Sequence, residues 1–320
     1  MLFGDRAVRG RVRNQVKRLL VTGVHGFVGR TLARMVESER ALAAWRLLEA
    51  APSADLRNPA DAALLVGRDP PDAVIHLAAQ SSVPEAFRDP AGTLATNVLG
   101  TLHLLQALQA ASFRGRVVYV GTGDVYGQVA EEALPVAEQH VPVPRNPYAV
   151  SKFAAEALCR QWTFTEGMDI VLARPFNHIG PGQSERFVVS DFARQVAEIR
   201  AGLRAPVVRA GDIDVTRDFT DVRDVVHAYF ALLERAATGE TYNVCSGREQ
   251  SIRAILERLA VLAGVEVEVE VEPARLRKAE QRRMRGDASK IRAATGWEAA
   301  TPLDASLAAM LRHWENEVRR

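Results

Sequence analysis

The chain has 320 residues, which is long enough for one large α/β domain with a lobe or for two domains. Its content of 48% hydrophobic and 25% charged residues is that of an ordinary globular protein. Its net charge of only +2 argues against a nucleic-acid-binding surface, and no apolar run reaches the ~18–20 residues that a membrane span needs. Two well-separated cysteines, Cys159 and Cys245, lack metal-ligand spacing, so we expect a reduced cytoplasmic compartment and no metal site.

The first twenty residues, MLFGDRAVRGRVRNQVKRLL, are basic but lack the apolar core of a secretory signal. We interpret residues 1–16 as a solvated, disordered extension. Contact of this segment with nucleic acid or with a membrane is the weaker alternative.

The next segment alternates β-rich and helical stretches. VKRLLVTG predicts a strand, and VHGFVGRTLARMVE predicts a helix that follows it through glycines. Further strands are predicted in WRLLEA, DAVIHLAA, RVVYVG and MDIVLARP, with helices over about 59–66, 90–111 and 148–165. Strands that alternate with helices imply right-handed βαβ crossovers and a parallel sheet. We therefore expect a Rossmann-type doubly wound α/β fold, with a dinucleotide-binding domain over residues 17–174.

After about Arg174 the composition changes to Pro- and Gly-rich loops and shorter elements. Helices are predicted near 185–201, 222–236 and 252–263, and strands near 206–210 and 241–244. In GVEVEVEVEP, valines alternate with glutamates, which predicts a half-buried strand with a solvated acidic face. A cation site on the glutamates is a poor alternative. We expect residues 175–320 to form mainly a smaller α/β lobe, with some segments returning to the first domain.

Three glycines, Gly23, Gly26 and Gly29, are spaced G-x-x-G-x-x-G at the first strand–helix joint. Gly23 suits a tight turn, Gly26 allows close approach of a pyrophosphate, and Gly29 allows the helix to pack on the strand. The helix N-terminus adds free N–H groups and a positive dipole. This position in the fold, more than the glycines alone, favours a dinucleotide cofactor.

The region after the second predicted strand bears on which dinucleotide is bound. Glu49 would favour NAD by binding a ribose hydroxyl, whereas Arg46 or Arg57 would favour NADP by neutralising a 2′-phosphate. Asp55 and Leu56 are a plausible contact for the adenine side, although an Asp in a loop also has ordinary turn chemistry. NADP(H) and NAD(H) both remain candidates.

The stretch NPYAVSK places Tyr148 and Lys152 four residues apart, so on a helix they share a face. A phenol pKa of about 10 is too high for proton transfer at neutral pH, and a nearby ammonium together with a positive nicotinamide ring would lower it. Tyr148 could then act as an acid toward a carbonyl, while Lys152 could also hold the nicotinamide ribose. The alternative is an ordinary amphipathic helix.

Thr122, in VYVGTGDVYGQ, follows a predicted buried strand at the edge where doubly wound folds bind ligands. Its hydroxyl could hydrogen-bond a substrate carbonyl. Alone, Thr122 would be interpreted as a turn residue, but with Tyr148 and Lys152 it completes a triad.

Together, TGVHGFVG, HLAAQ, NVLGT, GTGDVYG, PYAVSK and ARPFNHIGPGQ resemble the extended short-chain dehydrogenase/reductases that act on nucleotide sugars. The resemblance runs from about Val16 to the C-terminus and is strongest to the GDP-4-keto-6-deoxy-D-mannose reductases, through VPEAFRDP, GDVYGQVAEEALP, RNPYAVSK, FNHIGPGQ, GDIDVTRDFTDVRDV and YNVCSG. It implies that Thr122, Tyr148 and Lys152 are catalytic. It also implies a homodimer formed by the helices near 90–111 and 148–165, and slightly favours NADPH.

The resemblance also assigns binding residues. For the cofactor these are Gly23, His25, Gly26, Phe27, Val28, Asp55, Leu56, Leu77, Ala78, Ala79 and Asn97, besides Tyr148 and Lys152, with Asn97 supporting a proton relay to the lysine. For a GDP-linked 4-keto-6-deoxyhexose they are Asp124, Asn177, Arg217, Arg277 and Glu280. Arg217 would bind the diphosphate through its forked guanidinium. The match of Arg277 and Glu280 is less secure, because Lys278 replaces a proline of the related dehydratases.

Those relatives, the GDP-mannose 4,6-dehydratases, carry a glutamate two residues after the catalytic threonine, where it removes the C5 proton. Asp124 stands at that place and is one methylene shorter, so its reach as a base is reduced. It could instead contact the sugar or cap the turn. We expect reduction of the C4 ketone to GDP-D-rhamnose. The alternatives are a dehydratase or bifunctional enzyme, reduction to GDP-6-deoxy-talose, and a non-catalytic cofactor sensor, against which the intact triad argues.

Overall fold

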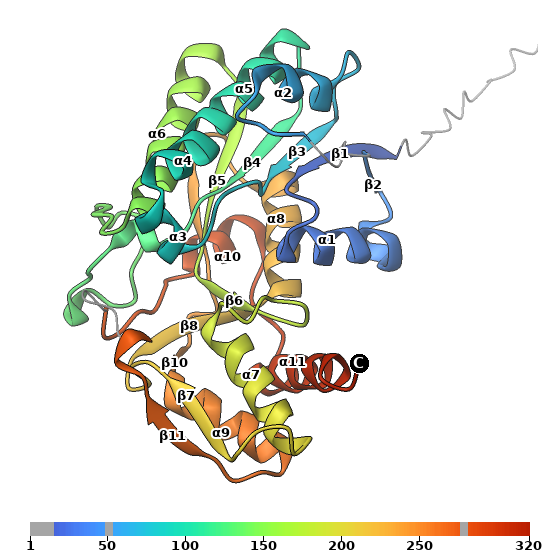
Figure 1. Cartoon of the computed structure of the whole chain (residues 1–320). Helices are drawn as coiled ribbons and strands as arrows, with labels where there is room; N and C mark the ends of the chain where they lie inside the picture. Colours follow the sequence, from blue (N-terminus) through green and yellow to red (C-terminus); the bar gives the residue numbers. More distant parts are fainter. Residues whose placement is uncertain (1–15, 49–53, 276–280) are drawn as a thin grey trace, which may run out of the picture.

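The computed structural model describes residues 16–48, 54–275 and 281–320. Figure 1 shows two parts: a sheet with helices on both of its faces, and a smaller lobe beneath it that contains the C-terminus. All but the last residue of the expected basic extension, together with Glu49, Arg277 and Glu280, lies outside the described residues. Among the described helices, none is both long and apolar enough to cross a bilayer.

A six-stranded sheet in the order β2-β1-β3-β4-β5-β9 forms the first part, and all its neighbouring strands pair in parallel. Its strands are β1 (Lys17–Thr22), β2 (Trp45–Leu47), β3 (Ala73–His76), β4 (Arg116–Val120), β5 (Asp169–Pro175) and β9 (Thr241–Val244). This confirms the predicted doubly wound sheet. From β1 the chain moves to β2 on one side and to β3 on the other, so the topological switch point lies between β1 and β3.

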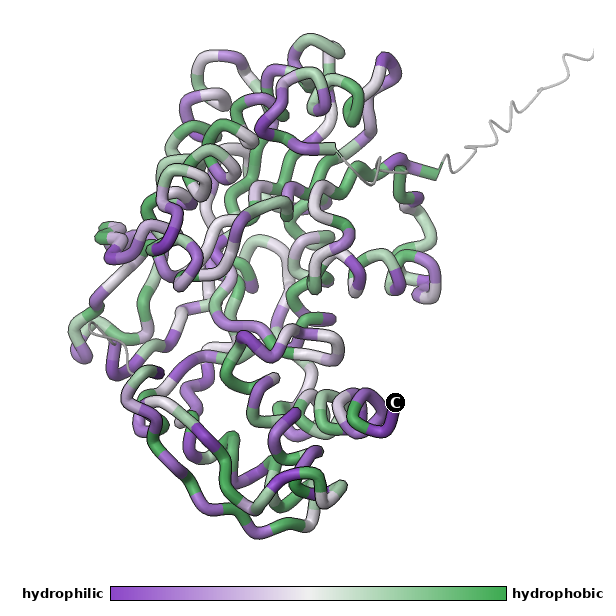
Figure 2. The backbone as a smooth tube through the Cα atoms, viewed as in Figure 1, coloured by the Kyte–Doolittle hydropathy of each residue, from purple (hydrophilic) through white to green (hydrophobic). Residues whose placement is uncertain are grey.

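Two helical layers cover the sheet because successive residues of its strands are buried, so both faces are apolar. Figure 2 shows that these strands consist largely of hydrophobic residues. Leu19 packs in a core with α1 and α8, whereas its neighbour Leu20 packs in a separate core with α2, α5 and α6. The helices of this part are α1 (Phe27–Ser38), α2 (Pro59–Val66), α3 (Val83–Arg88), α4 (Pro90–Leu94), α5 (Gly100–Ala110), α6 (Pro147–Glu166), α8 (Val222–Arg235) and α10 (Ser289–Thr295).

The lobe holds a third core between two small sheets and three helices. One sheet has the order β10-β8-β6, and the other pairs β11 with β7. The elements are β6 (Asn177–Ile179), α7 (Val188–Arg200), β7 (Val207–Ala210), β8 (Thr216–Asp221), β10 (Glu249–Ser251), α9 (Ile252–Ala263), β11 (Glu268–Val271) and α11 (Leu303–Glu317). The β10-β8-β6 sheet lies between the six-stranded sheet and the rest of the lobe (Figure 1).

Most predicted elements are present, but the expected helix over 90–111 is interrupted. A π-helical turn, η2 (Ala95–Leu99), separates α4 from α5. Such turns insert an extra residue into a helix and are frequent at functional sites. Sequence patterns also missed the β10-β8-β6 sheet, because β8, TRDFTD, looks polar although four of its six residues are buried.

The prediction of a half-buried strand in GVEVEVEVEP is wrong in one respect. The strand exists as β11, but Val269 and Val271 are 37% and 51% exposed, and Val265 and Val267, which do pack against the core, precede the strand. The reason is topological: β11 pairs with β7 in an outlying two-stranded sheet, so alternation alone overestimated how deeply its apolar face is covered.

Candidate active site

The glycine loop after β1 has three distinct local environments. Gly23 has a φ of +72°, and a Cβ placed on it would lie 2.8 Å from the backbone nitrogen of Ala78. A Cβ on Gly29 would lie 2.4 Å from the carbonyl oxygen of Gly23, so α1 packs directly on the loop. At Gly26 the nearest atom is 3.2 Å away. Packing therefore requires Gly23 and Gly29, while Gly26 is the glycine at which a ligand could approach the backbone.

The N-terminus of α1 opens onto this loop. Gly26 is its N-cap, and no side chain caps it. The peptide N–H groups of the first turn, which include Phe27 and Val28, therefore have no side-chain acceptor there and carry the positive end of the helix dipole. The exposed His25 is held through its carbonyl by Arg30 (2.6 Å), which also donates to Gly182 O (3.2 Å). This open, preorganised cradle fits the diphosphate of a dinucleotide.

The other described residues expected at the cofactor lie in the segments after β2 and β3. Leu77, Ala78 and Ala79 follow β3 directly and are half-buried beside the glycine loop. Leu56 is buried, and its carbonyl accepts a hydrogen bond from His103 Nδ1 (2.8 Å). Asp55 is paired with the exposed Arg57 (2.6 Å), and this pair lowers the pKa of the Asp55 carboxyl. The second arginine considered for a 2′-phosphate, Arg46, is also exposed.

Thr122 and Tyr148 meet, as expected from their places at the carboxyl edge of the sheet. Thr122 follows β4 and begins the short 3-10 turn η3 (Gly123–Tyr126), where its hydroxyl accepts from the amide of Asp124 (3.2 Å). Tyr148 lies in the first turn of α6, whose N-cap Asn146 accepts from Ala149 N (2.8 Å). Thr122 lies within reach of the Tyr148 phenol, and hydrogen bonding between the two side chains acts to lower the pKa of that phenol.

The electrostatics of Tyr148 differ from the expectation. Burial raises the pKa of Tyr148 well above its usual value, and the negative charge of Asp124 raises it further, while the hydrogen bond to Thr122 opposes both. Lys152 is not among the groups that shift the pKa of Tyr148, so the expected lowering by its ammonium is not found. The physical reason is that a phenolate here would lose hydration and face a carboxylate. Tyr148 therefore holds its proton firmly.

Lys152 lies one turn after Tyr148 on α6 and is buried. Burial lowers the pKa of Lys152 to about 8, while the neighbouring Cys159 and Glu156 act in the opposite direction. Its ammonium lies 4.8 Å from the centroid of the Tyr119 ring, a cation–π contact. The lysine is therefore poised to exchange a proton near neutral pH.

Asn97 is buried in η2 and connects two parts of the site. Its side-chain oxygen accepts from Gln80 N (2.8 Å), and its amide donates to Gln80 O (2.9 Å) and to Ser151 Oγ (2.8 Å). Gln80 follows the cofactor-side turn after β3, and Ser151 precedes Lys152. Asn97 thus joins the cofactor crevice to the helix that carries Tyr148 and Lys152.

The residues expected to bind substrate are distributed around the junction with the lobe. Asp124 and Asn177 are exposed, the latter at the start of β6. Arg217, in β8, donates to Thr216 O (2.7 Å) and to Gln281 O (2.8 Å). The strand register places Asn177 beside Phe219, two residues along β8 from Arg217. Both residues therefore belong to the β10-β8-β6 sheet.

Sequence patterns did not identify Gln281 or Asp218. Gln281 supplies the carbonyl that orients Arg217, and its side chain bridges to Val129 O (2.8 Å). Asp218 is 1% exposed and accepts hydrogen bonds from the amides of Ser246, Gly247 and Gly286 and from the Ser246 hydroxyl, at 2.6–3.2 Å. Because β8 was not predicted as a strand, the sequence offered no signal that Asp218 would be a buried carboxylate.

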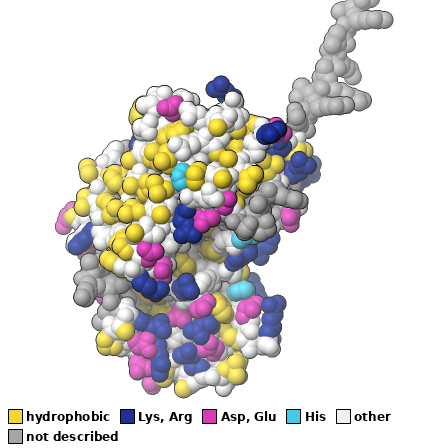
Figure 3. Space-filling view, turned by 45° about the horizontal axis from the view of Figure 1, so that its top comes forward, with side chains coloured by type: hydrophobic (Ala, Val, Ile, Leu, Met, Phe, Trp, Pro, Cys, Tyr) yellow, Lys and Arg dark blue, Asp and Glu magenta, His cyan; other side chains and the backbone are white. Residues whose placement is uncertain are grey.

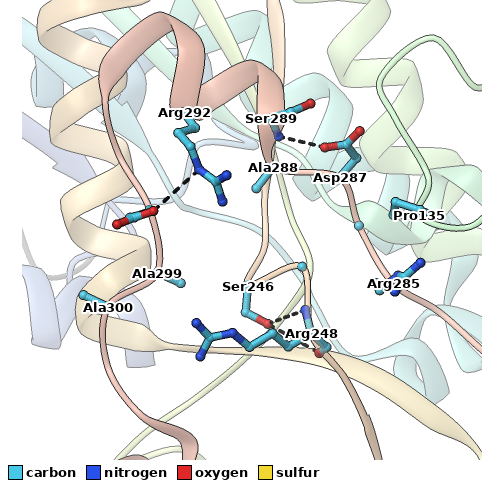
Figure 4. Close-up of a pocket in the computed structure, with 13 residues that line it drawn as sticks. Pro135, Ser246, Arg248, Arg285, Asp287, Ala288, Ser289, Arg292, Ala299 and Ala300 are labelled. Carbon is cyan, nitrogen blue, oxygen red and sulfur yellow. Dashed lines mark hydrogen bonds and ion pairs between the residues drawn. The ribbon is translucent and has the colours of Figure 1, made fainter.

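A cavity of about 740 Å³ lies beside this junction, shown in Figure 4. Arg248, Arg285 and Arg292 contribute to its wall, and Arg292 pairs with Glu298 (3.6 Å). None of the described residues assigned to cofactor or substrate lines it. Within the described part of the chain, no group of three or more His, Cys, Asp or Glu residues is arranged to hold a metal ion.

Comparisons with known proteins agree with this geometry. A family model described as GDP-mannose 4,6 dehydratase matches residues 49–310. The chain is 53% identical over 303 residues to a GDP-6-deoxy-D-mannose reductase of Pseudomonas aeruginosa, covering 95% of this chain and 99% of that protein. It is 27% identical to a GDP-6-deoxy-D-talose 4-dehydrogenase of Aggregatibacter actinomycetemcomitans, covering 86% and 90%. The solved structure of RMD from Pseudomonas aeruginosa complexed with NADPH aligns with a TM-score of 0.90 at 52% identity, covering 94% and 99%.

The glycine loop gives a prediction that separates folding from ligand binding. Gly26→Ala should weaken NADPH binding by about tenfold or more, because a methyl group would stand where the backbone approaches the diphosphate. Its melting temperature should fall less than that of Gly29→Ala, because its Cβ would lie 3.2 Å from the Gly23 carbonyl oxygen. Gly29→Ala should lower the melting temperature, because its Cβ would collide with the Gly23 carbonyl. Fluorescence titration and thermal melts measure both. Unchanged affinity in a folded Gly26→Ala variant would contradict the cradle.

Proposed function

The chain belongs to the GDP-mannose 4,6 dehydratase family, and on that premise we propose that it reduces the C4 ketone of GDP-4-keto-6-deoxy-D-mannose to GDP-D-rhamnose, using NADPH or NADH. The observation that carries the proposal is the nearness of Thr122 to the Tyr148 phenol, with Lys152 one helical turn away, beside a dinucleotide cradle. The reductase from Pseudomonas aeruginosa, at 53% identity over nearly the whole chain, supports the substrate. The name of that relative contains 6-deoxy-D-mannose, which is D-rhamnose, and this supports the D-rhamnose configuration at C4 of the product.

The proposed chemistry needs one hydride and one proton. A bound reduced nicotinamide supplies the hydride to C4, and the residues of the chain act on the carbonyl oxygen. The hydroxyls of Thr122 and Tyr148 polarise the C4 carbonyl by hydrogen bonding, and Tyr148 delivers its proton as the alkoxide forms. Lys152 stabilises the tyrosinate that results and passes a proton back to it.

The raised pKa of Tyr148 suits the reductive direction. A general acid must carry its proton when the ketone arrives, and burial together with Asp124 keeps the phenol protonated. Asp124 thus has a role in a reductase that does not require it to act as a base. In the dehydratase alternative, by contrast, the equivalent position must remove a proton from carbon.

The substrate residues are a further part of the proposal. Arg217 would bind the diphosphate, because its guanidinium is already oriented by Thr216 O and Gln281 O. Asn177, two register positions away in the same sheet, would add a hydrogen bond on the diphosphate side. Arg277 and Glu280 are proposed from the family alone, since they lie outside the described residues. The NADPH complex of the similar structure supports NADPH as the cofactor.

We also propose a homodimer. Phe87, Leu94, Leu99 and Val150, here called the α3–α6 patch, are each between 40% and 63% exposed and lie on elements that pack together. Figure 3 shows hydrophobic side chains gathered over the face that α4, α5 and α6 form, whereas charged side chains dominate the lobe. A monomer rarely exposes such a cluster, so a second copy is expected to cover it.

The first prediction concerns Tyr148. Tyr148→Phe should lower turnover of the 4-keto sugar by roughly 10²–10⁴, because it removes the positioned acid, and should leave NADPH binding intact. Tyr242→Phe, which removes a hydroxyl on β9 that accepts from Ala237 N (3.1 Å), is the control and should keep near-normal turnover. Similar activity in the two variants would refute the assignment.

The second prediction separates reductase from dehydratase. Supplied with GDP-mannose and catalytic NADP, the protein should form the 4-keto-6-deoxy product at least about 100-fold more slowly than it reduces that ketone, because Asp124 is short for the C5 hydrogen. NMR of the products measures both rates. Asp124→Glu should gain dehydration, and Asp124→Asn should not. Comparable wild-type rates would favour the dehydratase.

The third prediction concerns assembly. The protein should have a dimer mass at micromolar concentration in solution scattering, and Leu94→Asp should shift it toward a monomer by placing a charge in the α3–α6 patch. Val261→Asp, at an 80% exposed position on α9, is the control and should leave the mass unchanged. A monomer mass for the wild type would rule out this assembly.

A further inference from the structure

A line of buried hydrogen bonds runs behind the active site. The amide of Ala78 donates to Thr22 Oγ1 (3.1 Å), and that oxygen lies 2.6 Å from His76 Nδ1. On the other side of the ring, His76 Nε2 lies 3.0 Å from Thr101 Oγ1, whose hydroxyl donates to Asn97 O (2.7 Å). The three side chains in this line, Thr22, His76 and Thr101, are each at most 2% exposed. The line connects the turn after β3 with the π-helical turn η2.

The two ends of the line fix the direction of every hydrogen bond. The Ala78 amide only donates and the Asn97 carbonyl only accepts. Thr101 must give its hydrogen to Asn97, so its oxygen accepts from His76 Nε2–H. His76 Nδ1 must then accept the hydrogen of Thr22, whose oxygen accepts from Ala78. A neutral His76 with its hydrogen on Nε2 is the one state that satisfies all four bonds at once.

The line also contacts the helix that carries the proposed catalytic residues. Asn97, at its end, holds Ser151 Oγ (2.8 Å), the residue before Lys152. The Tyr119 ring packs against His76, with centroids 5.9 Å apart, and lies under the Lys152 ammonium. The Tyr119 hydroxyl donates to Lys152 O (3.0 Å). Strand β1, the turn η2 and helix α6 are therefore connected by contacts through His76 and its neighbours.

We propose that His76 and Thr101 are positioning residues for the reduction: they hold the backbone of Asn97, and through it Ser151 and Lys152, in a fixed place relative to the cofactor cradle. The turnover test of this inference rests on the proposed function. The site is buried, so water does not replace a lost hydrogen bond, and removing the Thr101 hydroxyl takes one partner from each of two polar groups, His76 Nε2 and the Asn97 carbonyl.

The surroundings of His76 keep it in the required state. Burial, and then the charge of Lys152 on α6, lower the pKa of His76 to about 3. The phenol of Tyr119, from β4, packs on the ring and itself has a raised pKa because of burial, so it stays neutral. A protonated His76 would have donors on both nitrogens, would break the direction of the line at Thr22, and would place a second cation close to Lys152.

Thr101→Val tests the line at its most specific link. It keeps the shape of the side chain and removes both hydrogen bonds. Thr295→Val is a closely matched control: Thr295 is 2% exposed, donates to Ile291 O (2.7 Å) and accepts from Trp297 N (3.1 Å), but lies at the end of α10. We expect Thr101→Val to lower kcat by about tenfold or more, and Thr295→Val to leave it unchanged. Thermal melts should show similar losses of stability in both.

Thr101→Ser should restore kcat to within about twofold, because it returns the hydroxyl. Equal kcat values in Thr101→Val and Thr295→Val, at equal stability, would overturn the positioning role. An inactive wild type would instead contradict the proposed function and leave the line to be judged by the spectroscopic test.

Nitrogen NMR of the ¹⁵N-histidine-labelled full chain with NADPH bound provides that test. The His76 signals, identified by their loss in His76→Gln, should show the neutral Nε2–H form from about pH 5 to 9. A hydrogen on Nδ1, or protonation within this range, would overturn the inference even if the threonine variants failed to fold.

Discussion

The close contact between two backbones, Gly23 and Ala78, sets the geometry on which the rest of the site depends. A side chain at Gly23 would collide with the peptide of Ala78, so the turns after β1 and β3 meet without intervening atoms. This contact brings the Thr22 hydroxyl within reach of the Ala78 amide and leaves the first turn of α1 facing the crevice. The positions of the cradle, the hydrogen-bonded line and the catalytic helix consequently all depend on the topological switch point between β1 and β3.

The patterns in the sequence predicted the parts of the fold that depend on burial by helices on both faces. Strands such as β3 are continuous apolar runs, and that signal is local. β8 escaped notice because its buried carboxylates, Asp218 and Asp221, find donors far along the chain, including Ser246, Gly286 and Ser306. No window of residues around β8 contains those partners. The overestimated burial of Val269 and Val271 has a similar origin. Alternation of apolar and charged residues predicts that a strand has an apolar face, but not whether other elements cover that face.

For the site, the sequence predicted that Thr122 would lie at the carboxyl end of a strand, and the resemblance to a known family implied that it would act with Tyr148 and Lys152. It did not predict the direction of the pKa shift of Tyr148, since burial and the nearness of Asp124 are properties of the folded chain. The sequence also did not identify His76, because nothing in the pattern distinguishes it from the other residues of the buried strand β3. Its role depends on two threonines, 54 residues before and 25 residues after it. Directional hydrogen bonding has no periodic signature in a sequence.

The position of β9 has a consequence for the order in which the protein is made. This strand completes the six-stranded sheet at its β5 edge, yet the ribosome synthesises it only after β6, α7, β7 and β8 of the lobe. When β5 has left the ribosome, its edge is therefore apolar and unpaired. Helix α8, which packs on one face of β5, has not yet been synthesised at that stage. Sixty-five residues, 176–240, separate β5 from β9, and until they are synthesised the β5 edge is open to wrong pairing and to chaperones.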